Sequence, residues 1–398
     1  MKKAVIALVL LAMMLPLAAV QAEDNPTVAI LRFGSLRTFD VTEGAILDVL
    51  ESYGWISAEE NAQLSNREDL EGENINIIWG SADFDLPSAN LMLEATLDQE
   101  PDVLLTITTA ITQLAINAVA DLDDPPTVLF TSVYNPYKAG ILESACIKPA
   151  HVGGSLSSTP YEEVLSLLMD ENPDIQTIGT IFNSAEAAGV VGVAEIKRIA
   201  EAQGLEVIEA AVADISDISL AAEGLISKGI DAFVMPIDLR TGAAGLPIVV
   251  NLGNEYGIPV FHPILFSIYY GATVSSGFYH YYAQGENVGV LLAAHLNGDI
   301  DIATTAINEQ TGNAIGINLD MAGRQEIEIS QELIDQADAV IRNGEAMISD
   351  RVGAELRMQG EIMSMEDRMM GDQEFLANLH CSPERIAEEQ AALDAMES

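Results

Sequence analysis

Basic side chains are scarce in this sequence. Its 398 residues include 17 lysines and arginines against 61 aspartates and glutamates, which gives a formal net charge of -44 at pH 7. So acidic a surface repels the phosphates of nucleic acids and the anionic headgroups of lipids. We therefore expect neither nucleic acid nor a membrane surface as a partner.

Cysteine is also scarce, with only Cys146 and Cys381 in the chain. They lie far apart and form no CxxC or zinc-like spacing, so metal binding through sulfur is disfavoured. In an oxidising compartment the two residues can either form a disulfide or remain two unrelated thiols, and the sequence leaves both alternatives open.

No long apolar run follows residue 20. The single such run spans residues 4–20, after Lys2 and Lys3 and before Gln21 and Ala22. This pattern predicts a signal peptide over residues 1–22, because the run is short for a membrane span of about 20 residues. No lipid-anchor cysteine follows it, so we expect a periplasmic or secreted mature protein starting at Glu23.

Catalytic motifs are missing. The chain has no GxGxxG after a strand, no GxxxxGK[ST] loop and no HExxH, and GGSLS at 153–157 departs from the GxSxG pattern. We expect no enzyme, no cofactor and no metal site, and an exported hydrolase is disfavoured. The histidines are scattered singly: His151, His262, His280, His295 and His380.

What the sequence does contain is a repeated alternation of β-branched runs and helical patterns, typical of βαβ units. The first unit has predicted strands at 28–33, 75–79, 103–107 and 128–131, with helices at 42–53, 88–98 and 110–119. The rhythm restarts after 151–155, with strands at 177–182, 205–210, 232–236 and 259–262 and helices at 186–203, 219–228 and 245–256. A strand at 272–278, a helix at 282–297 and a strand at 314–319 follow.

This pattern predicts an α/β fold of two doubly wound, Rossmann-like lobes joined by a multi-strand hinge. About 375 mature residues suit two domains. We expect the first lobe at 23–154 plus about 279–313, the second at 155–278 plus about 314–343, and an acidic helical extension at 344–398.

Small polar residues follow several predicted strands. Thr108 and Thr109 open a helix in the first unit, where their hydroxyls and the free N–H groups either receive a carboxylate or simply cap the helix. Asn183 and Glu186 occupy the equivalent place in the second unit, and Asp238 follows a further strand. Ligands bind at the carboxyl edges of such sheets, so we expect these residues to line a cleft. Aromatic candidates for its walls are Phe33, Phe39, Tyr134, Phe261, Phe278 and Tyr279.

Several segments, in their order and spacing, resemble one known family. They are SVYNP at 132–136, AGIL at 139–142, KP at 148–149, VGGS at 152–155, IGTIFNSAE at 178–186, IPVF at 258–261, GA at 271–272 and INL at 317–319. Over residues 27–341 the chain is similar to bacterial ABC transporter substrate-binding proteins whose best-studied members take up aromatic amino acids, with a type I periplasmic binding fold.

The resemblance implies an exported, monomeric solute-binding protein that presents a small organic solute to an ABC permease in the inner membrane. It implies that the ligand's carboxylate meets Thr108, Thr109, Ser132 and Asn183, with Asp238 in the same cleft. The chain departs from the family at His280, where an aspartate often stands. An imidazole is a poor partner for an ammonium group at neutral pH, so this departure counts against an amino-acid ligand. The expected solute is a small organic molecule, either an amino acid or a related carboxylate.

Two further alternatives stay open. The same fold serves equally as a ligand-sensing subunit for a membrane receptor kinase. In the extension, Met358, Ile362, Met365 and Met369 fall at helical spacing, which favours an amphipathic helix docking on the lobes or on a partner, whereas clustered thioethers suit Cu(I).

Overall fold

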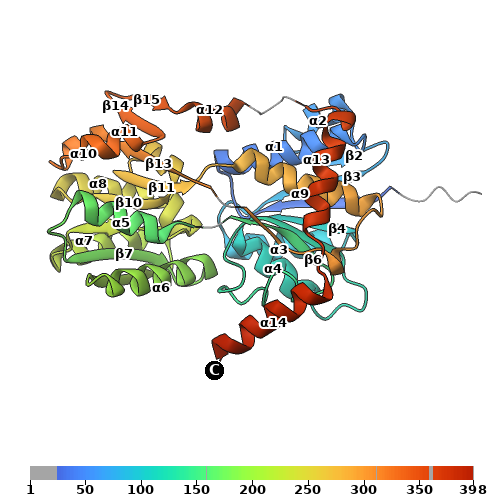
Figure 1. Ribbon diagram of the computed structural model, residues 1–398, viewed down its shortest axis with the longest axis horizontal. Coiled ribbons are helices and arrows are strands. Elements are labelled where there is room, and N and C mark those ends of the chain that lie inside the picture. The colour runs from blue at the N-terminus through green and yellow to red at the C-terminus, as the bar shows by residue number, and fades with distance from the viewer. Residues whose placement is uncertain (1–24, 158, 311, 358–361, 398) are drawn as a thin grey trace, which may run out of the picture.

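The computed structural model describes residues 25–157, 159–310, 312–357 and 362–397, so the predicted signal peptide lies outside the described residues. Two α/β lobes stand side by side, each built around one sheet (Figure 1). The predicted fold class is therefore confirmed.

The sheet of the first lobe has seven strands in the order β12-β6-β5-β4-β1-β3-β2. All of its neighbouring strands run parallel except β2 and β3. Parallel strands with helices on both faces read as near-continuous apolar runs, which is why the sequence located them well. The strands are β1 Thr27–Arg32, β2 Leu70–Glu71, β3 Asn76–Ser81, β4 Val103–Ile107, β5 Thr127–Tyr134, β6 Val152–Ser157 and β12 Asn308–Gln310.

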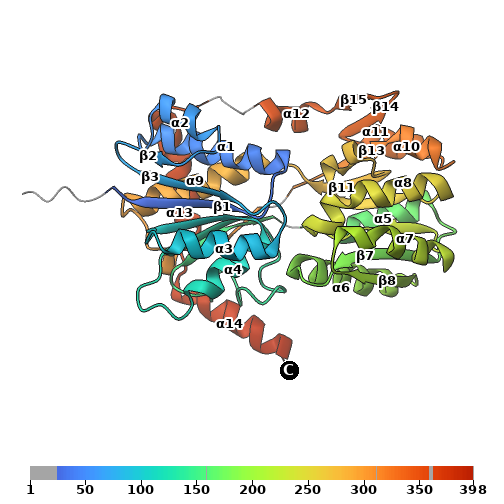
Figure 2. The ribbon, with the colours of Figure 1, turned by 180° about the vertical axis from the view of Figure 1, so that it is seen from behind.

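Helices cover both faces of this sheet (Figure 2). On one face, α1 and α9 pack extensively against each other, although they are far apart in the sequence. The helices are α1 Arg37–Ser52, α2 Ala58–Leu64, α3 Leu86–Leu97, α4 Thr109–Val119 and α9 Tyr281–Leu296.

The sheet of the second lobe has eight strands in the order β15-β14-β13-β11-β10-β9-β7-β8. It is mixed, because β13 runs antiparallel to β11 and β15 antiparallel to β14. Its strands are β7 Thr177–Asn183, β8 Glu206–Val212, β9 Ala232–Val234, β10 Val260–Ile264, β11 Val274–Phe278, β13 Asn313–Asn318, β14 Ala339–Arg342 and β15 Glu345–Ile348. The helices are α5 Tyr161–Glu171, α6 Ala187–Ala202, α7 Ile218–Ser227, α8 Leu246–Tyr256, α10 Leu319–Arg324 and α11 Gln331–Gln336.

The chain passes between the sheets after β6, after β11 and after β12. Three such connections form the expected hinge, about which two lobes can close around a ligand.

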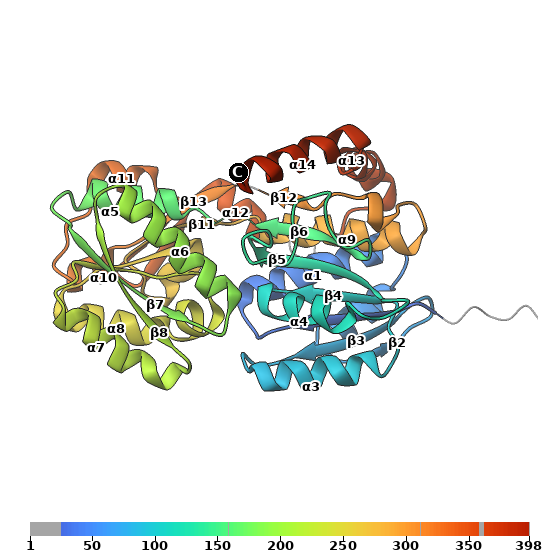
Figure 3. The ribbon, with the colours of Figure 1, turned by 90° about the horizontal axis from the view of Figure 1, so that it is seen from below.

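The segment after residue 343 differs from the expected all-helical extension, because it begins with β15 at the edge of the second sheet. Three helices follow: α12 Asp350–Arg357, α13 Met365–Asn378 and α14 Pro383–Glu397. Helices α13 and α14 lie along the first lobe (Figure 3). A disulfide between Cys146 and Cys381 fixes this attachment and decides between the two alternatives left open by the sequence.

The methionine-rich face of the extension is not what docks it. Met365 and Met369 are exposed, and Met358 lies outside the described residues. Instead Arg368 of α13 is buried against Glu286 at 3.0 Å, and Phe375 packs on the core of the first lobe.

None of the helices within the described residues combines the length and the apolar character that crossing a membrane requires.

Candidate functional site

A cavity of about 670 Å³ lies between the lobes. Its lining comes from the carboxyl ends of strands in both sheets, where the sequence placed the candidate site. Of the predicted residues it is lined by Phe39, Thr108, Thr109, Ser132, Tyr134, Glu186 and Asp238.

On the first lobe, the cavity meets the N-terminus of α4. Thr108, Thr109 and Ala110 line it there, and the N–H groups of a first helical turn have no partner within the helix. The Thr109 hydroxyl accepts the backbone N–H of Tyr134 at 3.1 Å, whereas the buried Thr108 hydroxyl has no partner among the described residues. This corner therefore presents unused hydrogen-bond donors, as a carboxylate requires.

Backbone strain marks the same corner. Thr108 has φ 98° and Ser132 has φ 54°, conformations that are rare for residues with a side chain. Such strain clusters at ligand-binding sites, where the surrounding structure holds it.

On the second lobe, the cavity meets two carboxylates, those of Glu186 and Asp238. Both are buried, with 3% and 1% of their surface exposed. Asp238 accepts the N–H groups of Asn183, Thr241 and Gly242 and the Thr241 hydroxyl, so its oxygens are occupied. Glu186 accepts the Leu239 N–H at 3.0 Å through Oε2, while its Oε1 has no partner among the described residues.

The two carboxylates also differ in charge state. Burial, and then the neighbouring charge of Asp238, raise the pKa of Glu186 to about 7. Burial also raises the pKa of Asp238, but its hydrogen bonds act in the opposite direction. Because donors stabilise an ionised carboxylate, we assign the negative charge to Asp238 and the titrating proton to Glu186.

The remaining wall of the cavity is largely aromatic. Phe266 contacts Tyr269 and Tyr281 with ring centroids 6.1 Å apart in each pair, and Phe278 meets Tyr281 edge-on at 5.5 Å. All four rings line the cavity, together with Tyr279. Such a surface suits a large apolar or aromatic ligand group.

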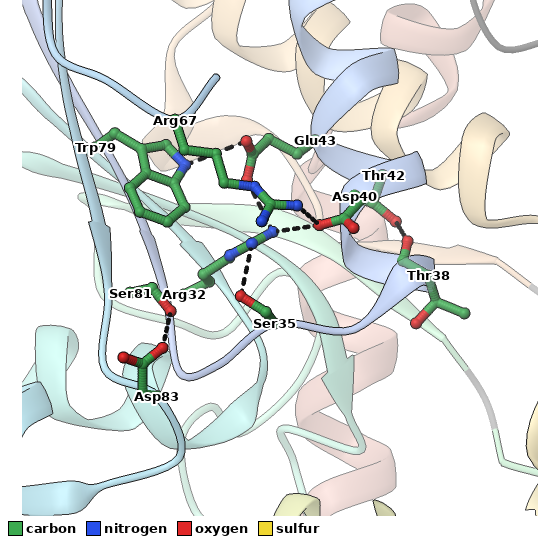
Figure 4. A network of polar contacts seen from close by, with 10 residues as sticks. All are labelled: Arg32, Ser35, Thr38, Asp40, Thr42, Glu43, Arg67, Trp79, Ser81 and Asp83. Atoms are coloured by element: carbon green, nitrogen blue, oxygen red, sulfur yellow. Dashed lines mark hydrogen bonds and ion pairs between the residues drawn. The ribbon is translucent and has the colours of Figure 1, made fainter. Parts of the chain in front are cut away.

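An ion-pair network around the buried Arg32 supports the start of α1 (Figure 4). Phe39 lies in the first turn of this helix. Arg32 is fully buried at the end of β1 and donates to Asp40 at 2.8 Å, to Glu43 at 3.3 Å and to the Ser35 hydroxyl at 2.9 Å. Its guanidinium also lies 5.0 Å from the centre of the Trp79 ring. The network ties the residue Ser35 before α1, and the first two turns of α1, to the sheet, which fixes the wall that Phe39 contributes.

Three predicted site residues do not line the cavity: Asn183, Phe261 and His280. The Asn183 side chain accepts the Ala185 N–H at 2.8 Å, and Phe261 is buried in the core of the second lobe. His280 lies behind the wall, with its Nδ1 2.6 Å from Glu355 Oε1. Phe33 is likewise a core residue.

Several lining residues were missed by the sequence reading. His262 lines the cavity where Phe261 was expected, because neighbouring strand residues point to opposite faces. Burial lowers the pKa of His262 to about 4, so this imidazole is neutral at physiological pH. Ser267, Arg37 and Glu355 also line the cavity, but they lie away from the strand ends that guided the prediction.

No group of three or more histidine, cysteine, aspartate or glutamate side chains gathers into a metal site within the described residues.

Two α/β lobes with a ligand-sized cavity between them define a two-lobed solute-binding protein. The sequence matches the ABC transporter substrate binding protein family over residues 63–341, and the chain belongs to this family. A relative named tyrosine-binding protein, from Clostridioides difficile strain R20291, is 27% identical over 253 residues, which cover 62% of this chain and 72% of the relative.

Solved structures share the fold. The ABC domain in complex with L-Trp from Streptococcus pneumonia has a TM-score of 0.68 at 23% identity, covering 80% of this chain and 100% of that one. A conserved domain protein from Vibrio cholerae gives the same values. The ligand-free, open substrate-binding protein with adhesive properties from Clostridium difficile has a TM-score of 0.53 at 23% identity, covering 80% and 99%.

Proposed function

We propose that the protein is exported, captures an amino acid with a large aromatic side chain between its lobes, and delivers it to an ABC permease. The observation that carries this proposal is the pairing of two opposed polar corners in one cavity. Thr108 and the N-terminus of α4 present donors on one lobe, and Glu186 presents a free carboxylate oxygen on the other.

The ligand in this proposal spans both corners. Its carboxylate binds the helix N-terminus and the Thr108 hydroxyl, while its ammonium binds Glu186 Oε1. Glu186 thus acts as the acidic partner of the ammonium group, a role that His280 cannot fill. The aromatic side chain occupies the wall formed by Phe266, Phe278 and Tyr281.

The relatives support the same chemistry. One bears the name tyrosine-binding protein, and another was crystallised with L-Trp. Export rests on the predicted signal peptide and on the family, whose transport role requires the binding protein to meet its solute outside the cytoplasm. The disulfide between Cys146 and Cys381 agrees with an oxidising compartment.

A thermal-shift screen of residues 23–398 tests this function. The ligands are L-tryptophan, L-tyrosine and L-phenylalanine. Two analogues serve as comparisons: tryptamine lacks the carboxylate, and indole-3-propionate lacks the ammonium group. A ligand at 100 times its dissociation constant adds about 2.7 kcal/mol to the free energy of unfolding, so binding is readily detected. We expect shifts with the amino acids and much smaller ones with the analogues. No shift with any of the three amino acids, or equal shifts with the analogues, would refute the proposal.

Thr108→Val sharpens the test, because it removes a hydroxyl that has no partner among the described residues. We expect an unchanged or slightly higher melting temperature without ligand, but roughly ten- to hundredfold weaker binding, since the hydroxyl meets a charged group. Thr127→Val, at the opposite end of the neighbouring strand β5, is the matched control and should leave affinity unchanged.

A further inference from the structure

The chain continues beyond the segment that matches the family, and this continuation reaches the ligand cavity. The match ends at residue 341, whereas Ile348 and Glu355 both line the cavity wall. Part of the binding site is therefore built from residues that the family match does not cover.

Glu355 presents a buried hydrogen-bond acceptor at this wall. Its side chain is 13% exposed, and its Oε1 lies 2.6 Å from His280 Nδ1. Its second oxygen, Oε2, is buried and has no partner among the described residues. A buried acceptor left unpaired is unfavourable, so a ligand that brings a donor to this point gains binding free energy.

The position of Glu355 is well fixed by the turn before it. Arg351, one helical turn earlier on α12, forms an ion pair with Asp338 at 2.5 Å and lies 5.1 Å from the centre of the Tyr279 ring. The Ser349 hydroxyl donates to the same aspartate at 2.9 Å, and Val352 is fully buried. A side chain held in a fixed position in this way can discriminate between ligands of different shape.

Aromatic rings connect the main cavity wall to this carboxylate. Phe266 contacts Tyr281 at 6.1 Å, Tyr281 contacts Phe278 at 5.5 Å, and Phe278 contacts His280 at 5.9 Å. Except for His280, these rings line the cavity. A ligand ring lying along them would direct its outer edge towards Glu355.

We propose that Glu355 is a specificity-determining residue, whose Oε2 accepts a hydrogen bond from a donor on the aromatic end of the ligand. The phenol hydroxyl of tyrosine and the indole N–H of tryptophan have this chemistry, whereas the phenylalanine ring lacks it. The inference rests on the proposed function, because it assumes an aromatic amino acid in the cavity. A site built to hydrogen-bond a ligand group selects against analogues that lack it.

Calorimetric titration of the mature chain with L-tyrosine, L-tryptophan and L-phenylalanine tests this inference. We expect the wild type to bind tyrosine or tryptophan roughly ten- to hundredfold more tightly than phenylalanine. Glu355→Met keeps the length of the side chain but removes the acceptor. This variant should bring the three affinities close together while phenylalanine binding is retained, which also demonstrates that the variant is folded.

Two further variants serve as comparisons. Asp350→Asn removes one exposed acidic charge from the same helix and should leave the selectivity unchanged. Ser267→Ala removes a buried hydroxyl that lines the cavity and has no partner among the described residues.

An unchanged preference in Glu355→Met, or its loss in Ser267→Ala alone, would overturn the role of Glu355 while leaving amino-acid binding intact. Equal wild-type affinity for the three ligands would do the same. Failure of all three to bind would instead refute the proposed function, and with it this inference.

Discussion

At the scale of single residues, Glu186 and Asp238 illustrate how two neighbouring carboxyl groups acquire different roles. Three backbone N–H groups and one hydroxyl donate to Asp238, whereas Glu186 accepts the Leu239 N–H through Oε2 and its Oε1 has no partner among the described residues. Asp238 therefore organises the turn that it caps, and the proposed function assigns the remaining oxygen of Glu186 to the ligand. The sequence identified both residues as candidates from their places after strands, but it could not count the donors around each of them.

The titration of Glu186 predicts pH-dependent binding. Its pKa is raised from the ordinary 4.5 to about 7, and only the ionised form attracts an ammonium group. Affinity for an amino acid should therefore fall as the pH is lowered through about 7, by up to about tenfold per pH unit below the pKa. Calorimetry from pH 8 to 5.5 measures this, and Glu186→Gln should remove the dependence. A flat profile in the wild type would contradict the assignment.

The same group affects the stability of the ligand-free protein in a defined direction. A carboxyl group whose pKa is higher in the folded state stabilises the fold at low pH, and this contribution is lost as the pH rises from about 4.5 to about 7. The difference in the free energy of unfolding between wild type and Glu186→Gln should follow this window.

At the scale of secondary-structure elements, the central parallel strands were predictable because both faces of each are buried. The burial patterns of β1, β4 and β9 contain almost no exposed position, and such runs are easily found in a sequence. β15 was missed because it is a four-residue edge strand whose residues are mostly exposed, without a periodic apolar pattern. α5 was passed over even though Val164, Leu165 and Leu168 are buried at helical spacing.

The C-terminal helices show why the candidate site could be predicted only in part. Strand ends follow from the alternation of elements, so Thr108, Thr109 and Glu186 could be found. Glu355 reaches the cavity only because β15 pairs with β14 and directs α12 to the hinge, and this tertiary pairing leaves no local signal.

The attachment of these helices predicts a redox-dependent stability. The disulfide holds α13 and α14 on the first lobe, next to a bond from the Cys146 N–H to Glu389 at 2.8 Å. Reduction should lower the free energy of unfolding by about 2–5 kcal/mol, because the crosslink closes a long loop. Denaturant titration with and without reductant measures this effect. In the double variant Cys146→Ser, Cys381→Ser, the two curves should coincide; equal midpoints in the wild type would contradict the prediction.

At the scale of the whole molecule, side chains join the two lobes at two places. Arg240 of the second lobe donates to the Phe84 carbonyl of the first at 2.9 Å. Lys138 of the first lobe forms an ion pair with Glu195 of the second at 2.7 Å. These contacts favour the arrangement in which the lobes enclose a ligand, and any such bias contributes to apparent affinity.

Arg240→Ala tests this coupling between lobe contact and binding. The substitution removes contacts that exist only while the lobes meet, so we expect roughly two- to tenfold weaker ligand binding through faster dissociation. Stopped-flow fluorescence measures the dissociation rate. Arg342→Ala, at an exposed position of the same lobe, is the control. An unchanged dissociation rate in Arg240→Ala would mean that these contacts do not stabilise the ligand-bound arrangement of the lobes.

The central claim is that the protein encloses an amino acid between its lobes, with the carboxylate at the N-terminus of α4 and the ammonium at Glu186. A crystal structure of the complex with the amino acid that gives the largest thermal shift tests it most directly. We predict the ligand carboxylate within hydrogen-bond distance of the Thr108 hydroxyl and the first N–H groups of α4, with the ammonium against Glu186 Oε1. A ligand bound outside the cavity, or one whose carboxylate faces Glu186, would contradict the account.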